Sequence, residues 1–297
     1  MTKPLVDLGK YGIWYGNVDA LTTPVAQDAA RTIEGLGFTT MWVAEAVGRD
    51  PFVSSSVLFS ATSTLKLATG IAKIYARDPM TMLAGQNTVA EAFPGRFLLG
   101  LGVSHGHLVA GVRKHDYSKP YSYMVDYLAR MDKALFMATG PPENPGRVLA
   151  ALGPKMLALA ATQANGAHPY FTTPEHTVSA REVMGPEALL APEQMVVVST
   201  DPTEARRIAR AGMKIYLGLP NYANNLLRFG FTEDDIADGG SDRLVDAIVA
   251  WGAPDRIAAR VAQHHDAGAD HVCIQVLTDD RKVAPVHEWT ELAGALL

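Results

Sequence analysis

The chain has 297 residues, of which 48% are apolar and 19% charged, with a net charge of −5 and a single cysteine. This composition supports a large hydrophobic core and excludes an intrinsically disordered chain. Acidic and basic residues are interspersed without a basic stripe, so nucleic acid is not an expected partner. With no apolar run of about 20 residues, no signal pattern and no disulfide framework, we expect a cytoplasmic protein without a membrane partner.

The first part of the chain alternates between strand and helix signals. Residues 11–16 (YGIWYG) predict a strand, and the Thr-Thr-Pro run at 22–24 predicts a helix that ends before Gly37. Residues 39–45 predict a second strand that ends on Glu45. A helix is expected over residues 54–62.

Residues 66–106 predict a strand–helix–strand unit, around which the rest is interpreted. Residues 66–72 and 96–102 are apolar runs that end near glycine, and Asp78-Pro79 opens a helix between them that lasts to residue 93. Continuous apolar strands of this kind are typical of a parallel sheet that is buried on both faces.

The same alternation continues to the C-terminus. After a polar loop at 106–121 and a Pro-Gly-rich loop at 140–146, further strands are predicted at 147–152, 166–171, 194–199 and 271–276. Helices are predicted at 123–138, 153–164, 174–184, 201–212 and 254–267, with a helical insertion at 216–252 and a last helix at the end. Eight strands alternating with helices predict an α/β fold: one (β/α)8 TIM barrel over residues 1–297, with a helical insertion after strand 7. A doubly wound open sheet is the structural alternative.

Several common catalytic motifs are not found. The sequence contains no GxGxxG after the first strand, no Walker-type loop, no HExxH and no CxxC. His264 and His265 are adjacent on a predicted helix, so their side chains diverge by about 100° and form a poor metal pair. Cys273 lies in an apolar strand and is expected to be a buried, inert thiol. We therefore expect no metal site.

The candidates for chemistry are the polar and aromatic side chains at the carboxyl ends of the predicted strands. In a barrel these ends converge on one mouth, although each side chain alone also has a purely structural interpretation. In chain order they are Trp14, Tyr15, Asn17, Glu45, Lys73, Tyr75, His105, His107, His168 and Tyr170.

The turn at Leu152, Gly153, Pro154 and Lys155 is a different kind of candidate. It places backbone amides and a helix N-terminus at the barrel mouth, which is a favourable arrangement for an anion such as a phosphate. An ordinary loop of the barrel is the alternative. A phosphate seat beside a wide aromatic mouth without a metal signature favours a cofactor that carries the chemistry.

Four segments resemble the luciferase-like monooxygenase superfamily. Within this superfamily they resemble the branch that uses coenzyme F420, a deazaflavin. They are AARTIEGLGFTTMWVAEA (29–46), LATGIAKIYARDPMTMLAGQNTVAEAFPGRFLLGLGVSH (67–105), AALGPKMLALAATQANGAHPYF (150–171) and GAPDRIAARVAQHHDAGADHVCIQV (252–276). The resemblance implies a (β/α)8 barrel whose third strand ends in a bulge with a non-prolyl cis peptide, here around Gly70, Ile71 and Ala72, against which the deazaflavin ring leans. It also implies the remaining cofactor contacts, with Glu45 near the polar edge of the ring and Leu152, Gly153 and Tyr170 toward the phosphate side. Pro154 and His168 complete the expected cofactor-binding residues.

The chain departs from the alcohol and sugar-phosphate dehydrogenases of that branch at two positions. Where they carry a catalytic histidine after the second strand, this chain has Ala46, and where they carry an acid after the fourth, it has His105. We therefore expect a reductase or another oxidoreductase, with His105 as the candidate proton donor because histidine titrates near neutral pH. Glu45 is the second candidate for this role, and His105 is also expected to contact the cofactor.

Three functions stay open at this stage. The first is an F420-dependent oxidoreductase that transfers hydride between the deazaflavin C5 and a small, mainly apolar organic substrate. The others are an FMN-dependent monooxygenase on the same scaffold and a non-catalytic accessory subunit. Trp14, Tyr15, Lys73 and Tyr75 are expected to line the substrate pocket. The resemblance also implies a homodimer.

Overall fold

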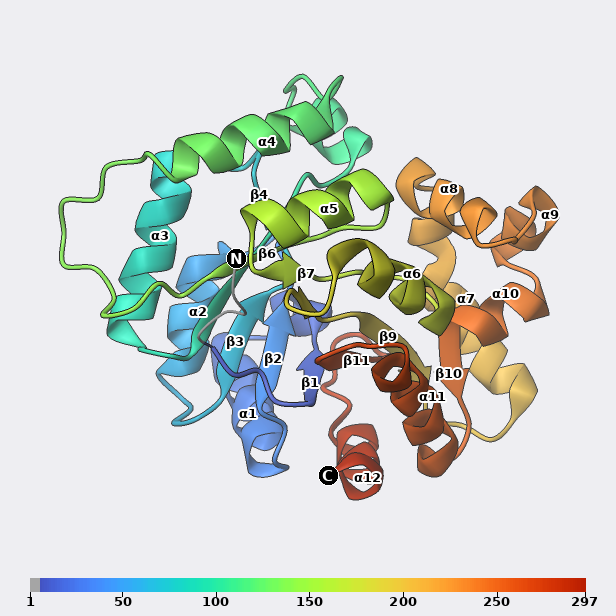
Figure 1. The fold of residues 1–297 in the computed structure, drawn as a ribbon. Coiled ribbons are helices and arrows are strands. Elements are labelled where there is room, and N and C mark those ends of the chain that lie inside the picture. Colours follow the sequence, from blue (N-terminus) through green and yellow to red (C-terminus); the bar gives the residue numbers. More distant parts are fainter. Residues whose placement is uncertain (1–5) are drawn as a thin grey trace.

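The computed structural model describes residues 6–297 as one curved parallel sheet surrounded by helices (Figure 1). Every strand pair in the sheet is parallel, and the hydrogen-bonded order is β10-β9-β11-β1-β2-β3-β5-β6-β7-β8, with β4 beside β5. The strands are β1 (Tyr11–Trp14), β2 (Thr40–Val43), β3 (Lys66–Thr69), β4 (Ala72–Lys73), β5 (Phe97–Gly102), β6 (Arg147–Leu149), β7 (Gly166–Ala167), β8 (Leu189–Leu190), β9 (Glu193–Val197), β10 (Val249–Trp251) and β11 (Val272–Val276).

The sheet closes into a barrel through the stretch that contains β8 and β9. Only Ala191 and Pro192 separate these two strands, and β8 pairs with β7 while β9 pairs with β11. Because β11 also pairs with β1, the last strand of the chain lies beside the first, and this pairing completes the ring. With β3 and β4 counted as one strand, and β8 and β9 as another, eight strands form the ring, which confirms the TIM-barrel prediction.

Most helices begin at proline, often after an aspartate. The Asp50, Asp78 and Asp201 carboxylates each accept a hydrogen bond from backbone amides of the first turn that follows, and a proline stands at the first helical position each time. The helices are α1 (Thr23–Gly35), α2 (Pro51–Phe59), α3 (Pro79–Ala92), α4 (Pro120–Met131), α5 (Pro154–Gln163), α6 (Pro174–Met184), α7 (Pro202–Leu217), α8 (Pro220–Arg228), α9 (Glu233–Ile236), α10 (Asp242–Ile248), α11 (Pro254–Asp266) and α12 (Val286–Leu296).

The structure corrects four of the expected boundaries. The loop expected at 106–121 contains one π-helical segment, η2 (His107–Val112), and α4 runs over Pro120–Met131 instead of 123–138. Helix α7 continues through Gly212 to Leu217, because the missing side chain of this glycine leaves room for Leu277. The insertion at 216–252 holds α8, α9 and α10 as expected, but it ends in β10, which pairs with β9.

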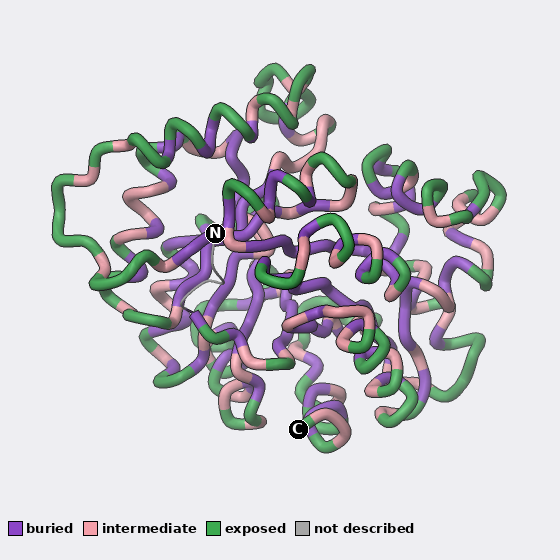
Figure 2. The backbone as a smooth tube through the Cα atoms, in the orientation of Figure 1, coloured by how far each residue is buried: buried purple, intermediate pink, exposed green. Residues whose placement is uncertain are grey.

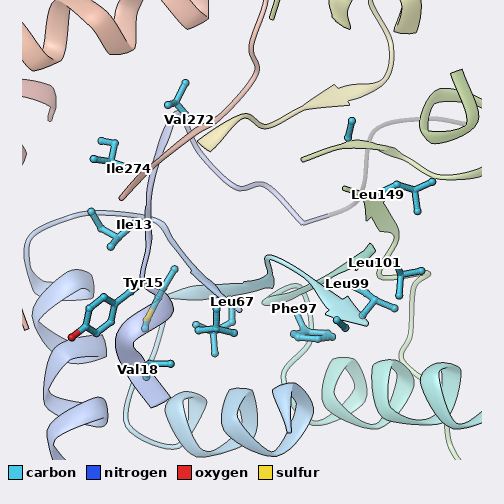
Figure 3. Close-up of a cluster of buried hydrophobic side chains, with 14 of the residues drawn as sticks. Ile13, Tyr15, Val18, Leu67, Phe97, Leu99, Leu101, Leu149, Val272 and Ile274 are labelled. Carbon is cyan, nitrogen blue, oxygen red and sulfur yellow. The ribbon is translucent and has the colours of Figure 1, made fainter. Parts of the chain in front are cut away.

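Side chains alternate between the barrel interior and the layer under the helices. Ile13, Leu67, Leu99 and Ile274 face the helices in one large core cluster, part of which is drawn in Figure 3. The neighbouring residues, among them Trp14, Trp42, Leu98 and Cys273, form a separate buried cluster. The strands are therefore buried on both sides, as the purple central strands of Figure 2 show.

Candidate active site

The third barrel strand is interrupted where its carboxyl end reaches the barrel mouth, the end of the barrel at which the parallel strands finish. The peptide bond between Gly70 and Ile71 is cis, and it separates β3 from β4. This location agrees with the one that the family resemblance implies. The Gly70 amide donates to Val43 O at 2.8 Å, which ties the break to β2.

The interior face of β5 leaves room beside this break. A Cβ added at Gly102 would lie 2.5 Å from Ile71 Cγ1, and one added at Gly100 would lie 1.9 Å from Thr69 O. Both glycines are therefore required for the close approach of the third strand. The Thr69 hydroxyl bonds to the carbonyl oxygen of Gly100 at 2.7 Å, and the Gly100 amide donates to the same hydroxyl at 2.8 Å.

Two aromatic nitrogens point at Gly70 without a hydrogen-bond partner among the described residues. The position of a Cβ on Gly70 is 2.6 Å from Trp14 Nε1 and 3.1 Å from His168 Nε2, and both nitrogens are buried and unpartnered. A buried polar atom without a partner is costly, so each of these two nitrogens needs an explanation. Because neither nitrogen is exposed and no Cβ fits between them and Gly70, the two rings and Gly70 form one closed wall, which is the candidate contact surface for a bound group.

His168 is held rigidly in the barrel interior. Its ring stacks on Trp42 with centroids 4.2 Å apart, and its Nδ1 lies 2.8 Å from Ala191 O. Burial lowers the pKa of His168 to about 4, so the ring is neutral at pH 7. Because Nδ1 then carries the proton that is donated to the carbonyl, Nε2 faces Gly70 as a bare acceptor.

Glu45 is occupied by a salt bridge. Its Oε2 accepts from the Lys73 amide at 2.7 Å and from Arg77 Nη1 at 2.9 Å, while Oε1 accepts from Arg77 Nη2 at 2.8 Å. Both side chains are almost fully buried, with 7% of the Glu45 and 9% of the Arg77 side chain exposed. Both carboxylate oxygens already accept hydrogen bonds from Arg77, so the geometry disfavours Glu45 as the alternative proton donor.

Lys73 does not extend into solvent as an ordinary loop lysine would. Its Nζ donates to Ala46 O at 2.7 Å, and the residue is 4% exposed. Burial lowers its pKa, and the negative charge of Glu45 partly opposes this shift. Lys73 thus makes a buried contact with the loop after β2, and its place in a substrate pocket stays a prediction.

His105 lies half-buried between the loop after β5 and the insertion. Its ring centroid is 6.0 Å from that of His107 and 5.6 Å from that of Tyr222. Burial is the largest cause of its lowered pKa, a hydrogen bond to Asn221 opposes the shift, and the positive charges that His107 and Lys73 can carry add to it. His105 is therefore mainly neutral at pH 7.

Tyr170 belongs to an aromatic cluster that joins the sixth strand region to the insertion. Its hydroxyl lies 2.7 Å from both Tyr216 Oη and Gln275 Oε1, so it donates to the amide oxygen and accepts from Tyr216. Its ring is 5.0 Å from Trp14 and 6.2 Å from Tyr222. The hydroxyl is thus engaged within the protein, and the ring is the part that faces Trp14.

Tyr15 and Tyr75 were both expected in the substrate pocket, but their side chains have different surroundings. Tyr15 lies under the helices beside Val18, with its ring 5.1 Å from that of Trp289 on α12, so its side chain does not line the mouth (Figure 3). Tyr75 does line a cavity of about 460 Å³. The other walls of this cavity are His115, Asp116, Ser118, Lys119, Ser122 and Tyr123.

The turn at Gly153 forms the N-terminus of α5, as the sequence predicts. Gly153 is the N-cap and offers no side-chain hydrogen bond. Leu152 O lies 2.9 Å from Nε2 of His176 on α6, and burial lowers the pKa of this histidine to about 4. Pro154 and Lys155 are exposed at the start of the helix. The first amides of a helix have no partner within it, which makes this turn a candidate anion site.

Glu193 and Arg77 are two functional candidates that the sequence analysis did not identify. Glu193 is 1% exposed at the start of β9, and its Oε2 accepts from the Phe171 amide at 3.2 Å. Burial raises its pKa to about 8, so it is mainly protonated at pH 7. Arg77 could have been expected as the partner of Glu45, since both lie just beyond neighbouring strands.

Comparison with known proteins places the chain in a family. Residues 21–271 match the family model for luciferase-like monooxygenases. This protein therefore belongs to the luciferase-like monooxygenase family. It is 26% identical to a Mycobacterium tuberculosis protein provisionally named a coenzyme F420-dependent oxidoreductase, over 87% of this chain and 92% of that one.

Two solved structures illustrate the breadth of the shared fold. An F420-dependent secondary alcohol dehydrogenase, in complex with an F420–acetone adduct, has a TM-score of 0.79 at 14% identity, covering 98% of this chain and all of that chain. The oxygenating constituent of 3,6-diketocamphane monooxygenase from Pseudomonas putida, in complex with FMN, has a TM-score of 0.71 at 14% identity, covering 96% of each. At these identities the likeness establishes the fold alone.

Within residues 6–297, no cluster of three or more His, Cys, Asp or Glu side chains could hold a metal ion. In the same part of the chain no helix has the length and apolar character to cross a membrane.

Proposed function

We propose that this protein is an F420-dependent oxidoreductase that exchanges a hydride with a small organic substrate. The observation that carries the proposal is the contact surface at Gly70, where Trp14 Nε1 and His168 Nε2 lack partners, together with a separate anion site at Gly153. A flat ring with a phosphate-bearing tail needs two such features. The provisional name of the mycobacterial relative supports the same assignment.

The residues present fit this cofactor. Gly70, Ile71 and Ala72 would form the wall behind the ring, and the Leu152–Pro154 turn would hold the phosphate on its free amides. Tyr170 would contact the cofactor through its ring, since its hydroxyl is engaged with Tyr216 and Gln275. When bound, the deazaflavin supplies the hydride chemistry at C5.

We assign proton transfer to His105, and nearby charged groups influence its pKa. Its lowered pKa means that the neutral imidazole is the major form, which can accept a proton from an alcohol or donate its N–H to a developing oxyanion. Lys73, held at Ala46 O, adds positive charge near the place where the alcohol dehydrogenases of the branch are expected to carry a histidine. Glu45 fixes Arg77 and the Lys73 backbone, so its role is positioning.

The substrate is proposed to carry a polar group as well as an apolar part. The loop composition predicts a mainly apolar guest, but five of the seven residues that line the cavity at Tyr75 are polar or charged. Tyr75 and Tyr123, whose rings stack 4.5 Å apart, provide the flat apolar side. A small carbonyl or alcohol compound with an apolar body matches both surfaces.

An FMN-dependent monooxygenase is the second candidate, because the FMN-bound structure from Pseudomonas putida shares the fold over 96% of both chains. Separate titrations of the purified protein with F420 and with FMN, followed by fluorescence, distinguish the two. We expect micromolar binding of F420 and at least tenfold weaker binding of FMN. The reverse order would favour the monooxygenase. Binding of neither cofactor would reject both and favour an accessory subunit.

A further inference from the structure

Helix α8 of the insertion contacts both ends of the candidate cofactor site. At its start, Asn221 hydrogen-bonds His105, and the Tyr222 ring lies 5.6 Å from that of His105. At its end, Arg228 lies beside Gly153. Asn221 and Arg228 are about seven helical steps apart, which corresponds to about 10 Å along the axis. The insertion is therefore attached to the ring end and to the anion end of the site by one rigid element.

The Arg228 guanidinium faces the anion turn. The position of a Cβ on Gly153 is 3.8 Å from Arg228 Nη2 and 3.9 Å from Nη1, so the two terminal nitrogens are equally close to the glycine. Nη1 also donates to Asn225 Oδ1 at 3.0 Å, and Asn225 is 3% exposed, so it anchors the guanidinium from its own helix. Any larger residue at position 153 would narrow the space between the guanidinium and the helix terminus.

No carboxylate neutralises this arginine within the described residues. Arg228 forms no ion pair with any described residue. The positive charge of Arg228 helps to lower the pKa of His176, although burial is the larger cause. The N-terminus of α5 adds the positive end of a helix dipole at the same place. Two positive ends that face each other are unfavourable, and an anion between them removes that cost.

We propose that Arg228 is a phosphate-recognition residue, which the insertion places over the Gly153 turn to complete the seat for the cofactor tail. The inference rests on the proposed function, and it assigns the specific role of charge and bidentate hydrogen bonding to a residue outside the barrel strands. A guanidinium matches a phosphate diester through two parallel N–H···O bonds, which a lysine cannot reproduce. Recognition of the tail is thereby coupled to the position of α8.

The test compares two ligands: F420 and the riboflavin-level deazaflavin that has the same ring but lacks the phosphate. Wild type, Arg228→Gln, Arg228→Lys and Lys214→Gln are titrated with each by fluorescence at low and at high salt. Lys214 is an exposed lysine on α7, so Lys214→Gln removes one surface charge and serves as the matched control. Arg228 is exposed as well, and thermal melting of each variant checks that the fold is retained.

We expect Arg228→Gln to weaken F420 binding about tenfold, which corresponds to ~1.4 kcal/mol. Binding of the phosphate-free ligand should be unchanged. Arg228→Lys should recover part of the loss, Lys214→Gln should behave as wild type, and the salt dependence of F420 binding should decrease in Arg228→Gln. Equal F420 affinity for wild type and Arg228→Gln would overturn the inference and leave the proposed function standing. If wild type binds neither ligand, the proposed function fails and the inference fails with it.

Discussion

Replacing Gly70 with alanine should overpack the contact surface on which the cofactor assignment depends. The new Cβ would lie 2.6 Å from Trp14 Nε1, about 0.8 Å inside the shortest ordinary contact of 3.4 Å, and 3.1 Å from His168 Nε2. Neither ring has room to withdraw easily, because Trp14 contacts Tyr170 and His168 is stacked on Trp42 and bonded to Ala191. Overpacking of this kind typically costs ~1–3 kcal/mol.

Two measurements follow Gly70→Ala. Urea denaturation should show a loss of about 1–3 kcal/mol in the free energy of unfolding. Titration with F420 should show at least tenfold weaker binding, since displacing Trp14 or His168 would change the wall against which the ring is proposed to lie. Adding Trp14→Phe, which removes the clashing Nε1, should restore part of the stability. Stability loss without that recovery would point to a cause other than the Trp14 contact.

The matched control is Gly294→Ala on α12. No atom lies within 4 Å of the added Cβ, and the residue is exposed. Alanine in an exposed helix should stabilise this variant by roughly 0.5–1 kcal/mol and leave F420 binding unchanged. If Gly70→Ala had the stability and cofactor affinity of wild type, the account of a crowded wall at Gly70 would be refuted.

Three further predictions concern the charged groups of the site. Glu45→Gln should lower the free energy of unfolding by about 3 kcal/mol in urea titrations, because it leaves the nearly buried Arg77 with only Asp50 as an acidic partner; a loss below about 1 kcal/mol would contradict this view of the pair. Burial raises the pKa of Glu193 from 4.5 to about 8, so the stability that the protonated group contributes is present below pH 4.5 and lost as the pH rises toward 8. Unfolding curves of Glu193→Gln measured across this range should lack that decline. An unchanged pH profile would count against a buried, protonated Glu193. His105→Gln should lower kcat by a factor of about 100 or more while F420 affinity stays constant, and it should remove an inflection of the kcat–pH profile below 6.5, since the pKa of His105 is lowered; a wild-type profile in the variant would exclude His105 as the proton-transfer group.

The sequence was informative where local signals and the fold agree. Aspartate before proline marked the starts of α3 and α7, and apolar runs that end near glycine marked the strands on either side of α3. These features depend on neighbours in the chain and on backbone sterics, which a sequence pattern records directly. The positions of Glu45, His105 and the Gly153 turn at the carboxyl ends of strands followed from the barrel itself.

Other features depended on contacts between distant parts of the chain. Gly212 looked like a helix end, but it lies within α7 because Leu277 packs against it. Tyr15 follows Trp14 directly, so its side chain belongs to the opposite face of the strand, and the alternation along β1 could have revealed this. Glu193 has no such signal, because a carboxyl group inside a barrel is recognised only when Phe171 and the burial of β9 are known.

The most direct test of the account is a crystal structure of the protein with F420 bound. The account predicts the deazaflavin ring against Gly70, close to Trp14 and His168, with the phosphate on the Gly153 turn beneath Arg228. A ring bound elsewhere, or a phosphate that contacts neither Gly153 nor Arg228, would contradict it.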